Sequence, residues 1–249
     1  MSALLTLDGL SLSYDTAAGP VAALERVSLS VAPGERLGLV GASGSGKTTA
    51  MRAALGLLPP AARITAGRVG FDGTDITAGP PRALRGAGMA MVFQDARASL
   101  NPQRRAGDQL TDVLRAHLPL SRRAARARAV ALLAELGFAE PGAILPALPH
   151  RLSGGQCQRL ALGLALACAP RLLVADEPAT GLDAPGRAAV IDLLDRLARA
   201  RGMALVLITH DMRLAARLCD RVAVMEAGRL AEDGPAAELL AAPRSAAAR

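Results

Sequence analysis

The chain has 249 residues, a net charge of +7 and 51% hydrophobic residues. This composition excludes disordered and fibrous proteins and allows one large globular domain, or a domain with a smaller inserted lobe. The longest uncharged stretch, between Arg159 and Arg171, is shorter than the roughly 20 apolar residues of a membrane-spanning helix. Residues 1–13 lack the basic start of a signal peptide, so we expect a cytosolic protein.

The basic excess predicts a solvated surface, without a nucleic-acid partner. Aromatic residues make up only 2% of the chain, so the stacking surfaces of a single-strand binder are missing. All 29 basic residues except Lys47 are arginine. A single lysine among so many arginines indicates a position that needs a compact ammonium group.

The first predicted elements are strands. Residues 10–14 and 27–31 alternate apolar and polar side chains, which predicts an antiparallel β-subdomain. Tyr14, the only tyrosine, ends the first of these strands. From its residue type alone it could be a half-buried core residue.

A glycine-rich segment follows the apolar strand predicted at residues 36–40. This segment, residues 41–49 and called the glycine loop below, leads into a helix predicted over 50–58. A strand, a glycine loop and a helix in this order can direct backbone N–H groups at phosphate oxygens. Lys47 would then reach the β- and γ-phosphates, and the Thr48 hydroxyl would bind Mg²⁺. The alternative is a glycine-rich turn without a ligand. The loop residues are Gly41, Ala42, Ser43, Gly44, Ser45, Gly46, Lys47, Thr48 and Thr49.

The middle of the chain is predicted to be helical. Gln94 follows a strand predicted at 89–93, and helices replace strands over 101–148. Ser121 is predicted to cap a helix over 122–136, with an apolar stripe that ends at Gly137. The stripe consists of Val130, Leu133 and Leu136. The predicted solvated face of this helix consists of Arg122, Arg123, Arg126 and Arg128.

Residues 152–156, called the signature segment below, precede an apolar run at 160–169 that predicts a buried helix. The hydroxyl and backbone N–H groups at this helix start could bind a second anion. Ser153 could instead be an ordinary helix N-cap. The segment's candidate binding residues are Ser153, Gly154, Gly155 and Gln156.

Two acids close the apolar strand predicted at 171–176. Asp176 could bind Mg²⁺ and Glu177 could polarise an attacking water, because ligands collect at the carboxyl ends of parallel strands. A surface turn before Pro178 is the alternative. A helix opened by Pro185 and a strand at 204–209 follow, which predicts a βαβ unit that ends at His210. The three cysteines, Cys157, Cys168 and Cys219, are expected to be reduced packing residues.

Taken together and in this order, these motifs resemble the ATP-binding subunits of ABC transporters over nearly the whole chain. The resemblance implies an α/β fold, the P-loop NTPase fold of ABC type, with a mostly parallel sheet core, an antiparallel β-subdomain and an inserted helical subdomain. The chain 1–249 would be a single ATP-binding domain. Its core with the β-subdomain would span 1–100 and 171–249, and the helical subdomain 101–170.

The resemblance also implies the chemistry, which is hydrolysis of ATP with Mg²⁺. Glu177, His210 and Gln94 take the catalytic positions of the family, and Thr48, Gln94 and Asp176 the metal positions. Tyr14 stands where the family stacks adenine on an aromatic ring. Asp183, in the segment 181–183, matches the D-loop.

The partners implied by the resemblance are a second ATP-binding subunit, identical or homologous, in a head-to-tail dimer, two transmembrane permease subunits and an extracytoplasmic solute-binding protein. The chain would lie at the cytoplasmic face of the membrane. Residues 92–95 and 99–102 resemble the di/oligopeptide and nickel importers, although Ala96 replaces their usual proline. The end soon after 241–243 leans towards a nickel or other small-solute importer. A soluble ABC ATPase acting on DNA or ribosomes is the main alternative, and a non-ABC P-loop kinase or GTPase is opposed by the signature segment.

Overall fold

The computed structural model describes residues 3–242 and residue 245. Outside the described residues lie 1–2, 243–244 and 246–249. The signal-peptide prediction for residues 1–13 and the solute prediction from the end after 241–243 fall partly on these residues. The chain forms two compact units, Met1–Arg82 with Gly202–Arg249, and Ala83–Arg201. These limits differ from the predicted subdomain boundaries, which stay a prediction. Among the described residues, none of the helices combines the length and apolarity that crossing a bilayer requires.

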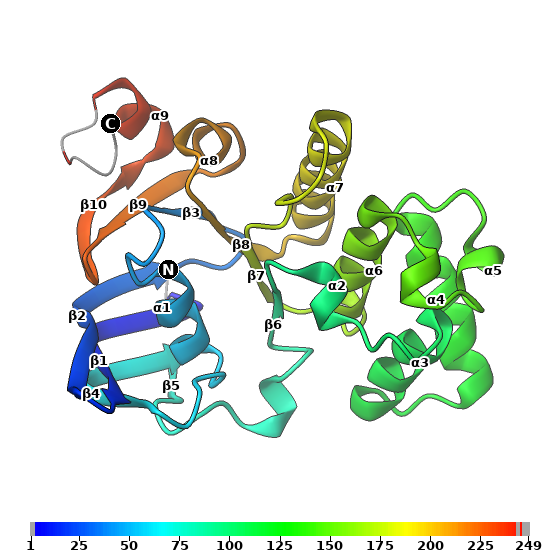
Figure 1. Ribbon diagram of the computed structural model, residues 1–249, viewed down its shortest axis with the longest axis horizontal. Helices are drawn as coiled ribbons and strands as arrows, with labels where there is room; N and C mark the ends of the chain where they lie inside the picture. Colours follow the sequence, from blue (N-terminus) through cyan, green and yellow to red (C-terminus); the bar gives the residue numbers. More distant parts are fainter. Residues whose placement is uncertain (1–2, 243–244, 246–249) are drawn as a thin grey trace. The chain divides into compact units, whose positions relative to one another are not determined.

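Within the described residues, the first unit contains one whole sheet, four strands of a second sheet and three helices (Figure 1). Its antiparallel sheet has the order β2-β1-β4-β5. Its second sheet portion runs β10-β9-β3-β8, in which β3 pairs in parallel with β8 and β9. The elements are β1 (Leu5–Thr16), β2 (Gly19–Val31), β3 (Arg36–Val40), α1 (Lys47–Ala54), β4 (Ala62–Phe71), β5 (Thr74–Asp75), β8 (Ala204–Thr209), α8 (Met212–Leu218), β9 (Arg221–Glu226), β10 (Arg229–Pro235) and α9 (Ala236–Ala241).

The predicted strands of this unit are confirmed. β1 and β2 pair antiparallel, with Leu5 opposite Val31 and Tyr14 opposite Val21. All six residues of β8 are buried, as an uninterrupted apolar run predicts for a parallel strand covered on both faces. The helix predicted over 50–58 is wrong in its limits, because α1 begins inside the glycine loop at Lys47 and ends at Ala54. It stops there because Gly56 takes a φ of 64°, which does not continue a helix.

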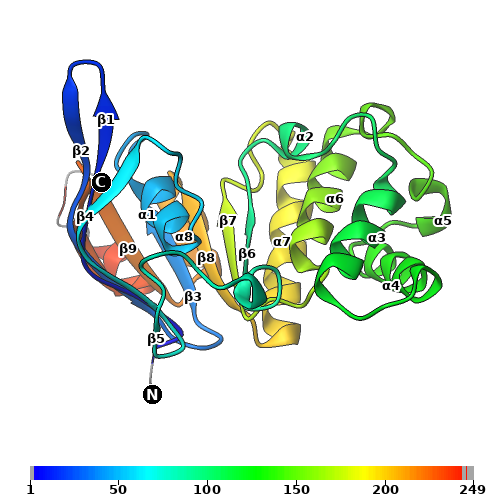
Figure 2. The ribbon, with the colours of Figure 1, turned by 90° about the horizontal axis from the view of Figure 1, so that it is seen from below.

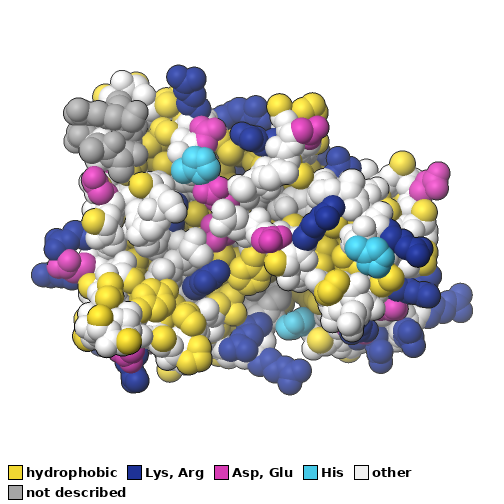
Figure 3. Space-filling model, in the orientation of Figure 1, with side chains coloured by type: hydrophobic (Ala, Val, Ile, Leu, Met, Phe, Trp, Pro, Cys, Tyr) yellow, Lys and Arg dark blue, Asp and Glu magenta, His cyan; other side chains and the backbone are white. Residues whose placement is uncertain are grey.

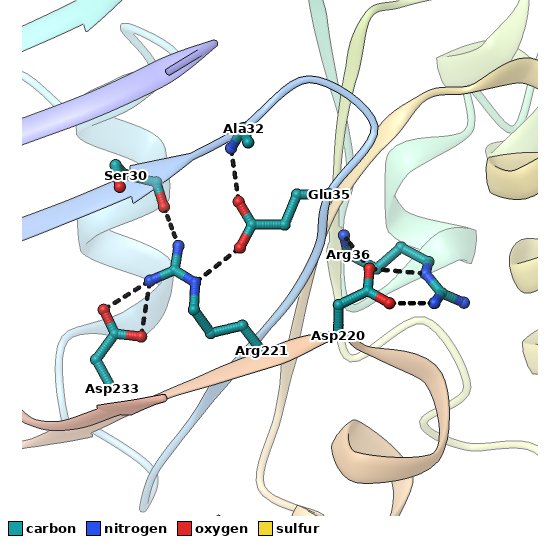
Figure 4. Close-up of polar contacts among 7 residues, drawn as sticks. All are labelled: Ser30, Ala32, Glu35, Arg36, Asp220, Arg221 and Asp233. Carbon is teal, nitrogen blue, oxygen red and sulfur yellow. Dashed lines mark hydrogen bonds and ion pairs between the residues drawn. The ribbon is translucent and has the colours of Figure 1, made fainter. Parts of the chain in front are cut away.

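One arginine ties three segments of this unit together (Figure 4). Arg221, at the start of β9, pairs with Glu35 in the turn before β3 and with Asp233 in β10, and it also donates to the carbonyl of Ser30 in β2. The Glu35 carboxylate in turn accepts a hydrogen bond from the Ala32 N–H, at 2.6 Å. This network fixes the turn that leads into β3, the strand that carries the glycine loop.

The second unit consists of helices and a parallel pair of strands (Figure 2). The helices α3 and α4 pack against each other, and α6 contacts both of them as well as β6. The elements are η1 (Arg82–Leu84, which begins at the boundary), β6 (Met89–Val92), α2 (Ala96–Ser99), α3 (Ala106–His117), α4 (Arg122–Glu135), α5 (Pro141–Ile144), η2 (Pro149–Arg151), α6 (Gly154–Leu166), β7 (Leu172–Asp176) and α7 (Ala184–Arg201).

The α4 prediction is confirmed at both ends and corrected in the middle. The Ser121 hydroxyl accepts from the Ala124 N–H at 3.2 Å, and Gly137 has a φ of 81° just beyond the helix. The predicted apolar stripe is wrong at Val130, which is 37% exposed, because the buried face runs instead through Ala125 and other small or branched residues. The buried residues of α4 are Ala125, Ala129, Leu132 and Leu133.

Within the described residues, the arginines are exposed or half-buried, whereas Lys47 is buried. The four arginines of α4 that were predicted to be solvated are exposed. On the face shown in Figure 3, Lys and Arg side chains are spread among other types. The three cysteines are buried thiols, as predicted, and burial raises the pKa of Cys157 and of Cys168.

Candidate active site

The glycine loop connects β3 to α1 in the first unit, and at two of its glycines a neighbouring residue lies too close for a side chain. At Gly41, with a φ of 154°, an added Cβ would lie 2.2 Å from the carbonyl oxygen of Met225. At Gly46, with a φ of 100°, it would lie 2.8 Å from the side chain of Leu24. Gly46 is also the N-cap of α1 and supplies no side-chain cap. The dipole of α1 favours negative charge at this helix start.

Lys47 crosses this loop. Its ammonium donates to the carbonyl oxygens of Gly41 at 2.8 Å and Ala42 at 2.7 Å, and lies 3.3 Å from the hydroxyl of Ser45. The residue is only 7% exposed. Three acceptors around one nitrogen suit an ammonium, which has three donors on one atom, whereas the planar guanidinium of arginine spreads its donors over a wide fork.

A cavity of about 490 Å³ opens beside the loop, within the range of ligand pockets. Tyr14 contributes to its wall, and the Tyr14 hydroxyl lies 3.2 Å from that of Thr49. Tyr14 is half-buried, so it has both the environment of a packing residue and a place beside the loop. The lining residues are Tyr14, Val21, Ala22, Ala23, Gly44, Gly46, Lys47, Thr48, Thr49, Ala227 and Gly228.

His210 lies at the same sheet edge as the glycine loop. In the parallel pair of β3 and β8, Val40 is opposite Thr209, so Gly41 and His210 each follow a paired residue. His210 is exposed. The next residue, Asp211, caps α8, because its carboxylate accepts a hydrogen bond from the Leu214 N–H at 3.0 Å.

In the second unit, the strand pair β6 and β7 brings Gln94 and two acids to one edge. Val92 is opposite Ala175, Gln94 follows two residues after Val92, and Asp176 follows Ala175. Asp176 is buried, with 4% exposure, and Glu177 is half-buried with a φ of 45°. A left-handed conformation is rare for a residue with a side chain and occurs often at functional sites.

The signature segment begins α6 with a capping box. The Ser153 hydroxyl accepts from the Gln156 N–H at 3.2 Å, and the Ser153 N–H donates to the Gln156 side-chain oxygen at 2.9 Å. The prediction that Ser153 is a helix N-cap is thus confirmed. Gly155 has ordinary helical geometry, and an added Cβ would meet no described atom within 4 Å. No contact within the described residues explains the absence of a side chain there.

Asp183 also caps a helix, because its Oδ1 accepts from the Gly186 N–H at 3.0 Å in the first turn of α7. Residues 180–182, which precede Asp183, line a cavity of about 460 Å³ within the second unit, together with Gln94 and the start of α6. The lining residues are Gln94, Asp95, Ala96, Arg97, Gly154, Gln158, Thr180, Gly181 and Leu182.

Each unit therefore gathers part of the predicted site. Tyr14, the glycine loop and His210 belong to the first unit. Gln94, Asp176 and Glu177 belong to the second, as do the signature segment and Asp183.

Sequence reasoning missed two polar residues of the second unit. Thr180 donates its hydroxyl to the Glu177 carboxylate at 2.8 Å, and a hydroxyl three residues after an acid was the available signal. Gln158 is 4% exposed, and its Nε2 has no hydrogen-bond partner in the part of the chain that is described. An amide just before the apolar run of a buried helix, at 160–169, was the signal there.

The chain is similar to known ATP-binding transport proteins. A family model described as ABC transporter matches residues 24–180. The dipeptide transport ATP-binding protein DppD of Escherichia coli is 42% identical over 97% of this chain and 75% of its own length. The oligopeptide transport ATP-binding protein OppD of Bacillus subtilis is 38% identical over 97% of this chain and 68% of its own. The dimeric ATP-binding cassette MJ0796, in a post-hydrolysis state bound to ADP and Pi, superposes with a TM-score of 0.82 at 26% identity, covering 93% of this chain and 98% of that one.

Proposed function

Because the chain belongs to the ABC transporter family and is an ATP hydrolase of that family, we propose that it powers the uptake of a dipeptide or oligopeptide through membrane permeases. The similarity to DppD over 97% of the chain is the observation that carries this proposal. The relatives named above are transport proteins for peptides, which favours a peptide over nickel and an importer over an ATPase acting on DNA or ribosomes.

ATP would bind in the cavity beside the glycine loop. The N–H groups at the start of α1 and the Lys47 ammonium would hold the phosphates, and Tyr14 would stack on the adenine. The volume of this cavity and the three glycine-loop acceptors of Lys47 support this assignment. On phosphate binding, the ammonium would exchange loop oxygens for phosphate oxygens, so it remains hydrogen-bonded in both states.

Mg²⁺ fits the residues proposed to hold it. Thr48, Gln94 and Asp176 offer a hydroxyl, an amide and a carboxylate oxygen, which are the hard ligands that this ion prefers. The buried position of Asp176 at a strand end supports the assignment. When bound, the ion would neutralise negative charge on the β- and γ-phosphates.

Glu177 would take a proton from the attacking water, and His210 would hold the γ-phosphate. A carboxylate at a strand end is suited to the first role because it accepts hydrogen bonds from water in its ionised form. The left-handed backbone of Glu177 supports a functional role, since such a conformation persists only where the surrounding structure holds it.

The signature segment would contact ATP held by a second ATP-binding subunit, in a head-to-tail dimer. Exposure of Ser153 and the unexplained glycine at 155 support a close approach from outside the chain. The dimeric state of MJ0796 supports the same arrangement. Loss of the γ-phosphate would remove the bridge between two helix N-termini and let the dimer open. Asp183 would lie at this interface.

The remaining partners would be two permease subunits and an extracytoplasmic peptide-binding protein. The chain would then be a peripheral protein at the cytoplasmic face of the membrane. Purification from detergent-solubilised membranes through a tag on this chain tests this directly. We expect two permeases to co-purify, and we expect the binding protein loaded with a dipeptide to stimulate ATP hydrolysis.

The Glu177→Gln variant tests the chemistry in the same complex. It should bind ATP as the wild type does and lose nearly all turnover, because the proton acceptor is removed while the glycine loop stays intact. Wild-type turnover by Glu177→Gln would refute the role of Glu177. Co-purification with ribosomes or DNA in place of permeases would refute the transport function.

A further inference from the structure

The backbone at Glu177 is unusual and well fixed. This residue follows the buried strand β7, and its φ of 45° turns the chain into the segment 177–180. The Thr180 N–H donates to the Glu177 carbonyl at 3.1 Å and closes this turn. Pro178 restricts one of the two inner residues. The turn is therefore closed by the backbone alone.

The Thr180 hydroxyl makes a second bond across the same turn. It donates to the Glu177 Oε2 at 2.8 Å, and the hydroxyl must be the donor because an ionised carboxylate only accepts. Thr180 is exposed, so its side chain is not placed there by packing into the core. Because the backbone already closes the turn, the hydroxyl contributes something else, namely the orientation of the carboxylate.

Thr180 also contributes to a cavity of the second unit. It lines the cavity that contains Gln94 and the first residue of α6, Gly154. The residue that donates to the Glu177 carboxylate therefore shares a cavity with two other predicted functional segments.

We infer that Thr180 is a positioning residue, which holds the Glu177 carboxylate in the orientation needed to activate water. This inference rests on the proposed function, since it takes Glu177 as the proton acceptor. A hydrogen bond to a charged group is strong enough to favour one side-chain rotamer over others. Loss of the hydroxyl should therefore reduce the fraction of molecules in which Glu177 is correctly oriented.

The test compares Thr180→Val, which has nearly the same shape without the hydroxyl, with Thr180→Ser, which keeps it. ATP hydrolysis is measured in the purified membrane complex in which the wild-type chain is active. We expect kcat to fall about tenfold in Thr180→Val, with KM for ATP within about twofold of wild type, and to recover in Thr180→Ser. Thr74→Val, at another exposed threonine, is the control and should behave as wild type.

A double variant separates this inference from the proposed function. In a Glu177→Gln background, Thr180→Val should cause no further loss of residual turnover, because it acts through Glu177. A further loss of the same size would overturn the inference, as would wild-type kcat in Thr180→Val or equal losses in Thr180→Val and Thr180→Ser. If Glu177→Gln itself were fully active, the proposed function would fail first, whatever Thr180→Val does.

Discussion

Arg221 and Glu35 form an ion pair, with Nε 2.7 Å from Oε1, although 186 residues separate them in the chain. Burial by itself would lower the pKa of Arg221, but the hydrogen bond to Glu35 and the charge of Asp233 outweigh it and raise the pKa above the ordinary value. The guanidinium therefore stays charged, and it holds the turn before β3 against β9 and β10. The strand that presents the glycine loop depends on this contact.

Replacing this arginine should destabilise the first unit. We expect Arg221→Met to lower the free energy of unfolding by about 2 kcal/mol, because it leaves the Glu35 carboxylate, 17% exposed, without its cation. Chemical denaturation followed by circular dichroism measures the change. The control is Arg229→Met, whose pair with Glu25 is 64% and 50% exposed and should contribute less than about 1 kcal/mol. Equal losses in the two variants would contradict this prediction.

Lys47→Ala should weaken binding of ATP at least about tenfold, because a charged donor to the phosphates is lost. Lys47→Arg should not restore it, since a guanidinium cannot place three donors on one atom among the acceptors around the loop. Titration of the purified chain with a fluorescent ATP analogue measures both. Arg52→Ala, which removes a positive charge from the end of the same helix, is the control. Restoration by arginine would show that charge alone suffices.

Gly155→Ala separates folding from assembly. Alanine fits the helix at this position and meets no described atom within 4 Å, so thermal stability should be unchanged or slightly higher. Turnover in the membrane complex should nevertheless fall several-fold, because the new methyl group would meet the neighbouring subunit's nucleotide. Gly142→Ala, at another glycine with no atom within 4 Å, should change neither property. Full activity in Gly155→Ala would argue against a close approach at the signature segment.

Gln158→Met should stabilise the protein. The buried Nε2 finds no partner among the residues described here, and an unsatisfied buried donor costs about 1–3 kcal/mol. Methionine has a similar volume without the donor, so the free energy of unfolding should rise by about 1 kcal/mol. Thermal unfolding measures the change, with Gln103→Met at an exposed position as the control. A destabilised Gln158→Met would show that the amide has a partner in the folded protein.

Much of the fold could be predicted because its strands carry clear patterns. β3, β7 and β8 are nearly uninterrupted apolar runs, and their boundaries agree with the predictions to within one residue. The start of α1 was missed because Gly46, which favours no helix by itself, is its N-cap. The face of α4 was misassigned because Ala125 and Ala129 are fully buried. Alanine fits both a crowded core and a surface, so a single sequence does not show which alanines of a helix are buried.

The candidate site was predictable at the level of motifs. The roles given to its residues remain predictions, while two observed contacts had no counterpart in the sequence analysis. Asp183 caps α7, and the Thr180 hydroxyl binds Glu177. Both are short-range side-chain contacts whose formation depends on the local backbone, and a motif match does not specify that backbone. Glu177 is the clearest example, since its left-handed φ is unfavourable for its residue type.

The capping box at Ser153 has a further consequence for recognition. Its oxygen accepts the Gln156 N–H, but a hydroxyl also carries a proton of its own to give away. The Ser153 hydroxyl can therefore cap α6 and donate to a phosphate at the same time. Binding a nucleotide held by a neighbouring subunit would not require the first turn of α6 to unfold. A recognition element that keeps its shape whether engaged or released can work through many cycles without refolding.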